Sequence, residues 1–180
     1  GLLFDITVKL GFSALAGMGM YMATVLLGLI GVLCFYLVLI SVIGRMNPLS
    51  FLTSVRETQL LAFSTSSSAA TMPFTLACAE EDLKVSPKIS RFMVPLGATI
   101  NMDGTALYQA VAAVFIAQAL GLSLGFHAQL TIILTAVLAS IGTAAVPGAG
   151  IIMLVIILEA VGIPSAGIAL ILGVDRILDM

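Results

Sequence analysis

The sequence predicts an all-α membrane protein in which transmembrane helices alternate with two re-entrant helical hairpins, arranged as inverted repeats. Three observations lead to this prediction. The chain of 180 residues is 61% hydrophobic and only 9% charged, whereas soluble domains carry about 25% charged residues. One uncharged run is longer than a bilayer requires. Two pairs of shorter apolar stretches each meet at a polar tip, which is typical of hairpins that enter a membrane without crossing it.

The first element is predicted to be a long transmembrane helix over residues 11–44. No charged residue lies between Lys9 and Arg45. At about 1.5 Å per residue this stretch is longer than the roughly 30 Å of a hydrocarbon core, so we expect the helix to be tilted. The residues before it have no initiator methionine and no basic region, so we expect a cut within a longer protein and not a signal peptide.

The second element, over residues 48–82, is predicted to be a re-entrant hairpin. Its first apolar half ends at the serine-rich segment Ser64 to Ser68, and its second half runs from Met72 to the acidic residues that begin at Glu80. Neither half is long enough to cross alone, although a single broken spanning helix is the alternative. Basic residues cluster at both ends, which predicts a cytoplasmic position for both; they are Arg45, Arg56, Lys84, Lys88 and Arg91.

The second half of the chain repeats this pattern. Residues 88–120 form a predicted transmembrane helix that is broken at Asn101 to Thr105, and residues 129–161 form a second hairpin around Gly142 to Gly150. A last transmembrane helix is predicted over residues 164–180. Because a helix and a hairpin occur twice, entering from opposite sides, we expect a binding site near the midplane of the membrane.

The break in the third element predicts a cation site. Asp103 lies within an apolar span, where a carboxylate is costly unless it is paired, hydrated or bound to a cation. Gly104 relaxes the helix, and the freed carbonyls, with Asn101, Asp103 and Thr105, offer the oxygen ligands that a hard cation prefers. We interpret this segment as a sodium site; the alternative is a polar kink that only holds helices together.

The two hairpin tips are predicted to contact an anionic substrate. Ser66, Ser67, Ser68 and Thr71 supply hydroxyls just before a helix start, where backbone N–H groups favour an anion. A solvated serine linker is the alternative interpretation. In the second tip, the glycines after Pro147 allow close approach and large dihedral changes, which suits a lid; a plain proline kink is the alternative.

Ionisable residues on the last helix form another candidate group. Asp175 and Asp179 are four residues apart and share a face, with Arg176 within reach. Such groups inside an apolar helix indicate function, for instance a carboxylate that binds a substrate's ammonium group, although an internally neutralised structural pair is the alternative. Cys34 and Cys78 have no metal-site spacing and are interpreted as packing residues.

Taken together, these motifs resemble those of the dicarboxylate/amino acid:cation symporters, the family that includes the glutamate transporters. The resemblance covers nearly the whole chain and rests on the serine tip, NMDGT at Asn101 to Thr105, ASIGTAAVPGAG at Ala139 to Gly150 and GVDRILDM at Gly173 to Met180. It implies part of a moving transport domain, a multi-pass protein of the inner (plasma) membrane, and a homotrimer formed through a scaffold domain that this chain lacks.

The resemblance also implies the site residues. Substrate is expected at Ser66, Ser67, Ser68, Thr105, Val146, Gly150 and Asp179. Co-transported sodium is expected at Gly97, Thr99, Asn101, Met102, Asp103, Ser140, Ile141 and Thr143, with a proton as the alternative coupling ion.

Substrate choice is only partly determined. The chain ends before the arginine that binds the distal carboxylate in this family, and Ser66 stands where some members carry a basic residue, a role that Arg176 is hypothesised to take over. In this family Asp179 is associated with the substrate's amino group, so it favours an amino acid over a C4-dicarboxylate, the alternative without such a group. Glutamate or aspartate is expected first, and a neutral amino acid such as serine, threonine or alanine is the next alternative. An ion channel is the alternative from another class, but unlike tips favour an occluding carrier.

Other classes are disfavoured by composition and pattern. The net charge of -2 offers no basic patch for nucleic acid. An intramembrane protease would need a pair of aspartates such as Asp103 and Asp175, but the hydroxyl-rich and glycine-rich tips would then have no role. We therefore expect no enzyme activity.

Overall fold

The computed structural model describes residues 12–180, and within that range it contains helices and connecting turns but no strand. This confirms the predicted all-helical class for the described part of the chain. The predicted start of the first helix at Gly11 lies outside the described residues. By length and composition, Ala16–Val42 and Pro87–Ala119 are each long and apolar enough to cross a membrane.

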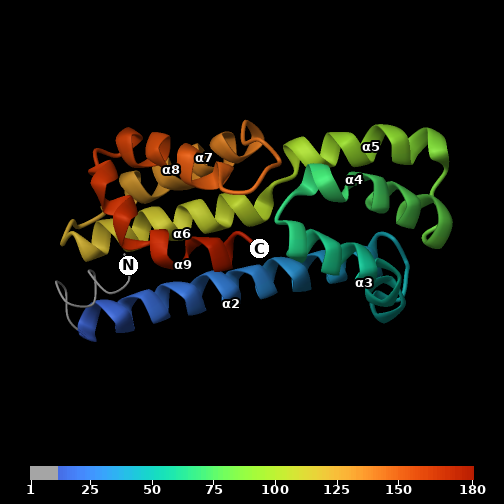
Figure 1. Cartoon of the computed structure of the whole chain (residues 1–180), viewed down its shortest axis with the longest axis horizontal. Helices are drawn as coiled ribbons and strands as arrows, with labels where there is room; N and C mark the ends of the chain where they lie inside the picture. Colours follow the sequence, from blue (N-terminus) through green and yellow to red (C-terminus); the bar gives the residue numbers. More distant parts are fainter. Residues whose placement is uncertain (1–11) are drawn as a thin grey trace.

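The first described helix, α2 (Phe12–Val42), runs along one side of the molecule (Figure 1). Its most apolar part has a mean hydropathy of 2.8, and only 6% of the residues there are buried. Met18, Tyr21 and Val25 are its buried exceptions and pack into the core. One narrow face of α2 therefore contacts the protein, and the remainder is suited to an apolar environment.

The first hairpin consists of α3 (Pro48–Thr65) and α4 (Ser68–Ala77), which pack against each other, followed by a short π-helix η1 (Cys78–Asp82). Asn47 caps α3 by accepting the Leu49 N–H at 2.9 Å. Ser66 ends α3 in the left-handed conformation with φ of 50°, and the Ser67 hydroxyl accepts the Ala70 N–H at 3.2 Å to start α4. The serines therefore form the turn itself, because their side chains satisfy helix ends.

The predicted broken helix is observed as α5 (Pro87–Ile100) and α6 (Asp103–Ala119), which lie nearly along one line in Figure 1. The backbone leaves the helical region at Asn101 (φ −92°, ψ 72°) and at Met102 (φ −108°, ψ 52°). Such angles interrupt the helical hydrogen bonds, so carbonyl groups around the break are free to accept other partners.

The second hairpin consists of α7 (Phe126–Ile141) and α8 (Ala149–Ala160), both of which pack on α6. Beyond it we predicted one helix over residues 164–180, but the structure contains a 3₁₀-helix η2 (Ser165–Leu170) and a short α9 (Leu172–Leu178). In η2 the buried Gly167 lies directly against the Ile116 side chain, a packing position that leaves no room for a Cβ atom. The tight 3₁₀ turn places this glycine against α6.

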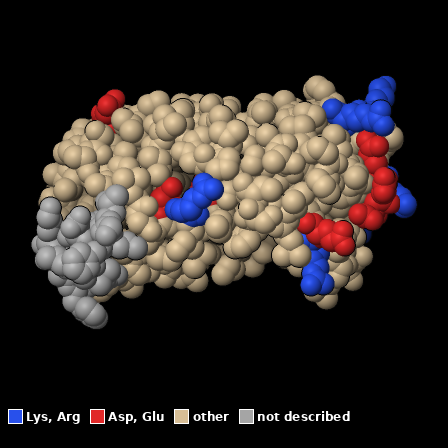
Figure 2. Space-filling model, viewed as in Figure 1, with Lys and Arg blue, Asp and Glu red and all other residues tan. Residues whose placement is uncertain are grey.

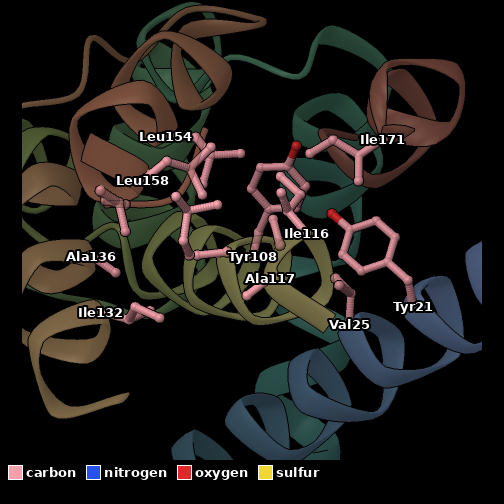
Figure 3. Packing of buried hydrophobic residues seen from close by; sticks show 14 of the residues in the cluster. Tyr21, Val25, Tyr108, Ile116, Ala117, Ile132, Ala136, Leu154, Leu158 and Ile171 are labelled. Carbon is pink, nitrogen blue, oxygen red and sulfur yellow. The ribbon is translucent and has the colours of Figure 1, made fainter. Parts of the chain in front are cut away.

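Side chains of α2, α6, α7, α8 and the C-terminal segment share one core, part of which is shown in Figure 3. Ile116, Leu154, Leu158 and Ile171 are fully buried in it. Charged side chains instead gather at the opposite end of the molecule, around the bases of the first hairpin and α5, while most of the visible face is uncharged (Figure 2). The core thus fixes α6 against the second hairpin, which positions the second tip.

Candidate functional site

Both hairpin tips, the α5–α6 break and the end of the chain surround one cavity of about 180 Å³. Every residue predicted to contact substrate lines it. The lining residues are Ala62, Ser66, Ser67, Ser68, Met102, Thr105, Thr143, Ala144, Ala145, Val146, Gly150, Asp179 and Met180. Hydroxyl groups, exposed backbone and one carboxylate therefore face the same small space, although they come from segments far apart in the sequence.

The two tips are joined by hydrogen bonds. The Ser67 hydroxyl donates to the Ala145 carbonyl at 2.8 Å, and the Ala69 N–H donates to the same oxygen at 3.4 Å. Each tip thus uses the other to satisfy polar groups next to the cavity. The sequence predicted the tips separately but did not predict this contact.

Asp179 links the end of α9 to the second tip. Its carboxylate accepts a hydrogen bond from the Gly148 N–H at 2.8 Å. Gly148 precedes α8 with φ of 78°, a left-handed conformation that glycine adopts without strain. Because N–H groups and the positive end of the helix dipole point outward there, a carboxylate is favoured at this position.

Gln109 of α6 holds the second tip from the other side. It is fully buried, and its amide donates to the Gly150 carbonyl at 3.0 Å, while its Oε1 atom has no hydrogen-bond partner. The sequence analysis did not single out this residue. A signal was present, since an uncharged but strongly polar amide occurs in the apolar stretch that follows NMDGT.

Several residues predicted to bind a cation at the break make hydrogen bonds within the chain. Asp103 is the first residue of α6, is exposed, and accepts a hydrogen bond from the Tyr36 hydroxyl of α2. The Gly97 carbonyl accepts the Asn101 N–H at 3.0 Å, and the Thr99 hydroxyl donates to the Leu96 carbonyl at 3.0 Å. A carbonyl oxygen has a second lone pair, so the contact of Gly97 leaves room for another partner.

Three other residues predicted to bind sodium, Ser140, Ile141 and Thr143, lie at or just after the end of α7. Ser140 and Thr143 are buried, and their hydroxyls donate to the Val137 and Ala139 carbonyls, each at 2.8 Å. Ile141 is exposed.

The eight predicted sodium residues do not share one cavity. Thr143 and Met102 both line the cavity between the two tips, so the break and the second tip meet there. Gly97 instead lines a separate cavity between α3, α4 and α5. Among residues 12–180, no three His, Cys, Asp or Glu side chains gather as a metal site.

The ionisable side chains in and just after α9 lie in different environments. Asp175 is buried and accepts a hydrogen bond from the Tyr108 hydroxyl, whereas Asp179 lines the cavity. Arg176 is exposed and does not line the cavity, so the structure does not bring it to Ser66. In the described part of the chain the one ion pair joins Arg91 to Glu80 at 3.3 Å, and it lies outside α9.

The chain is similar to known membrane transporters. A family model described as the sodium:dicarboxylate symporter family matches residues 1–180. The chain itself is 48% identical to excitatory amino acid transporter 2 of Homo sapiens over 163 residues, which is 90% of its length. It is 52% identical to excitatory amino acid transporter 3 of Mus musculus and 48% identical to an excitatory amino acid transporter of Caenorhabditis elegans, again over 163 residues. The match spans 28%, 31% and 32% of these three relatives.

Proposed function

Because the chain belongs to the sodium:dicarboxylate symporter family, we propose that the full-length protein couples inward sodium movement to uptake of an acidic amino acid, glutamate or aspartate, by alternating access. The observation that carries this proposal is the cavity in which both tips, the helix break and Asp179 converge. The similar relatives are named excitatory amino acid transporters, which supports the choice of substrate. Activity as a membrane transporter, placement in the plasma membrane and assembly as a homotrimer are all parts of the proposal.

Substrate binding is assigned to the residues that line the cavity. The hydroxyls of Ser66, Ser68 and Thr105 and the backbone at Val146 and Gly150 suit a carboxylate, because donors and small residues allow close contact. The Asp179 carboxylate suits an ammonium group. A cavity that offers both kinds of partner favours an amino acid over a C4-dicarboxylate, which has no ammonium group. A neutral amino acid remains the alternative within the family.

Sodium is assigned first to the break. Asn101 and Asp103 provide amide, carboxylate and freed backbone oxygens, which are ligands that hard cations prefer. Thr99, Met102, Ser140, Ile141 and Thr143 would supply other ion positions. Binding there would order the break and the tip together, which links ion occupancy to closure of the cavity.

The second tip is proposed to act as the lid of a re-entrant hairpin. Ala145 and Gly148 already bond to the first tip and to Asp179, respectively. When substrate enters the cavity, the tip would close over it, and the bond between Ser67 and Ala145 would help to hold it closed. The first hairpin would form the opposite wall of the occluded cavity.

The test is sodium-dependent uptake by the full-length protein in proteoliposomes, with radiolabelled aspartate, glutamate, serine and succinate. We expect the acidic amino acids to be preferred, Asp103→Asn to lose sodium dependence and Asp179→Ala to lose amino-acid uptake. Sodium-independent flux in the wild type, or unaltered uptake in both variants, would overturn the proposal. Conduction without saturation by substrate would favour a channel instead.

A further inference from the structure

Tyr36 is a tyrosine in the otherwise apolar second half of α2. Its neighbours Phe35 and Val38 are 60% and 59% exposed, as expected for a helix surface that faces an apolar environment. A phenolic hydroxyl in such surroundings requires a hydrogen-bond partner. In the structure that partner is the Asp103 carboxylate, to which Tyr36 donates across a sequence separation of 67 residues.

Asp103 has few other partners. Among residues 12–180 no lysine or arginine lies within ion-pair distance of it, and its carboxylate accepts one side-chain hydrogen bond, from Tyr36. It begins α6 immediately after the non-helical Asn101 and Met102. The helix dipole favours the negative charge at this position, but a carboxylate held by one neutral donor still has unused acceptor positions.

We propose that Tyr36 is a positioning residue for cation binding at the break. Its hydroxyl holds the Oδ2 atom of Asp103 and leaves Oδ1 to accept a cation. Because the carboxylate is already fixed, cation binding loses less side-chain freedom. The bond also connects the break to α2, which packs against α6, so the ion site includes an element outside the hairpins. This inference rests on the proposed function, which assigns sodium to Asp103.

The test is Tyr36→Phe in the full-length protein, reconstituted in proteoliposomes. Loss of one hydrogen bond to a charged group should raise the sodium concentration for half-maximal uptake about tenfold. The substrate KM at saturating sodium and the maximal rate should change by less than about twofold. A variant that only damaged the fold would lower the maximal rate and leave the half-maximal sodium concentration unchanged.

The chain offers a matched control. Tyr21→Phe also removes one phenolic hydroxyl from α2, but the Tyr21 hydroxyl makes no hydrogen bond to Asp103. Its half-maximal sodium concentration should therefore stay within about twofold of wild type. An equal shift in both variants, or no shift in Tyr36→Phe, would overturn the proposal. If Tyr36→Phe does not assemble, Tyr36→Met tests the same loss of the hydroxyl.

A double variant separates this inference from the proposed function. If Tyr36 acts through Asp103, adding Tyr36→Phe to Asp103→Asn should cause no further change in sodium dependence. An Asp103→Asn variant with wild-type sodium dependence would refute the sodium assignment itself. An Asp103→Asn variant that loses sodium dependence, together with a Tyr36→Phe variant that behaves as wild type, would refute only the role of Tyr36.

Discussion

The Ser67 hydroxyl donates a hydrogen bond of 2.8 Å to the Ala145 carbonyl, across a separation of 78 residues. This bond joins the tips of two hairpins that the sequence presents as independent segments. It places the serine hydroxyls and the second tip around the same cavity. If the second tip opens as proposed, it must break this contact, so the strength of the bond would contribute to the balance between open and closed states.

Substitution of Ser67 by alanine should weaken substrate retention. The variant leaves the Ala145 carbonyl without its hydroxyl donor, and loss of such a bond should raise the substrate concentration for half-maximal uptake by about two- to tenfold. Ser64→Ala is the control, because the exposed Ser64 hydroxyl donates locally to the Leu61 carbonyl at 2.9 Å. Radiolabelled uptake measures both; an equal effect of the two substitutions would contradict a role for the contact between the tips.

Asp179→Asn should keep the hydrogen bond that holds the second tip at Gly148 but weaken substrate binding. An asparagine side-chain oxygen can still accept the Gly148 N–H, but it carries no charge for an ammonium group. We expect amino-acid uptake to fall at least about tenfold. A cysteine introduced at Val146 of the second tip should be modified by an impermeant thiol reagent no faster than in the same background with Asp179. Asp179→Ala should lose both properties. Normal uptake by the asparagine variant would argue against an ammonium contact.

Gln109→Leu should make the second tip open more often, because it removes the hydrogen bond from Gln109 to Gly150. The substitution removes the donor to the Gly150 carbonyl but also the unpaired Oε1 atom, so the net effect on folding stability should be within about 1 kcal/mol. A cysteine introduced at Val146, which is 54% exposed, reports tip opening through its rate of thiol modification in a background without Cys34 and Cys78. We expect the rate to rise about two- to tenfold.

Gln118→Leu is the control for this experiment, because Gln118 lies on the same helix and is exposed. It should leave the modification rate unchanged. A similar rise in both leucine variants would mean that hydrophobicity of α6, and not the bond to Gly150, sets the position of the tip.

Glu80, at the charged end of the molecule, should make the thermal stability of the protein depend on pH. The Ser90 hydroxyl, which donates to Glu80 at 2.7 Å, and the Arg91 guanidinium hold the pKa of Glu80 below its usual range. Because the folded pKa is lowered, the stabilisation is present above the unfolded pKa of about 4.3 and is lost as the pH falls through the folded value. Glu80→Gln should therefore lower the melting temperature at neutral pH but not in strong acid.

Thermal unfolding of the full-length protein between neutral and acidic pH measures this difference. The neighbouring Glu81→Gln is the control, since Glu81 is exposed and outside these contacts. A melting difference between Glu80→Gln and wild type that persists in strong acid would show that the carboxylate is not its source.

Much of the fold follows from local patterns. Asn101 to Thr105 interrupts an apolar stretch, and the backbone leaves the helical region at Asn101 and Met102. The serines after Ser64 were predicted as a tip and form the turn between α3 and α4. These predictions succeeded because polar, capping and glycine residues determine where a helix ends largely through neighbours in the sequence. The single helix predicted over residues 164–180 was wrong, because Gly167 packs on α6 and its local pattern carries no signal of that contact.

The sequence by itself determined the helical class, the two tips, the break and the family motifs, all of which depend on the order of residues within short segments. Only the tertiary structure decided that Ser67 meets Ala145, that Asp179 bonds to Gly148 and that Tyr36 holds Asp103. It also placed Arg176 outside the cavity. These contacts depend on how each helix is rotated and packed against helices distant in the sequence, and a rotation that changes little in the local pattern redirects every side chain on the helix.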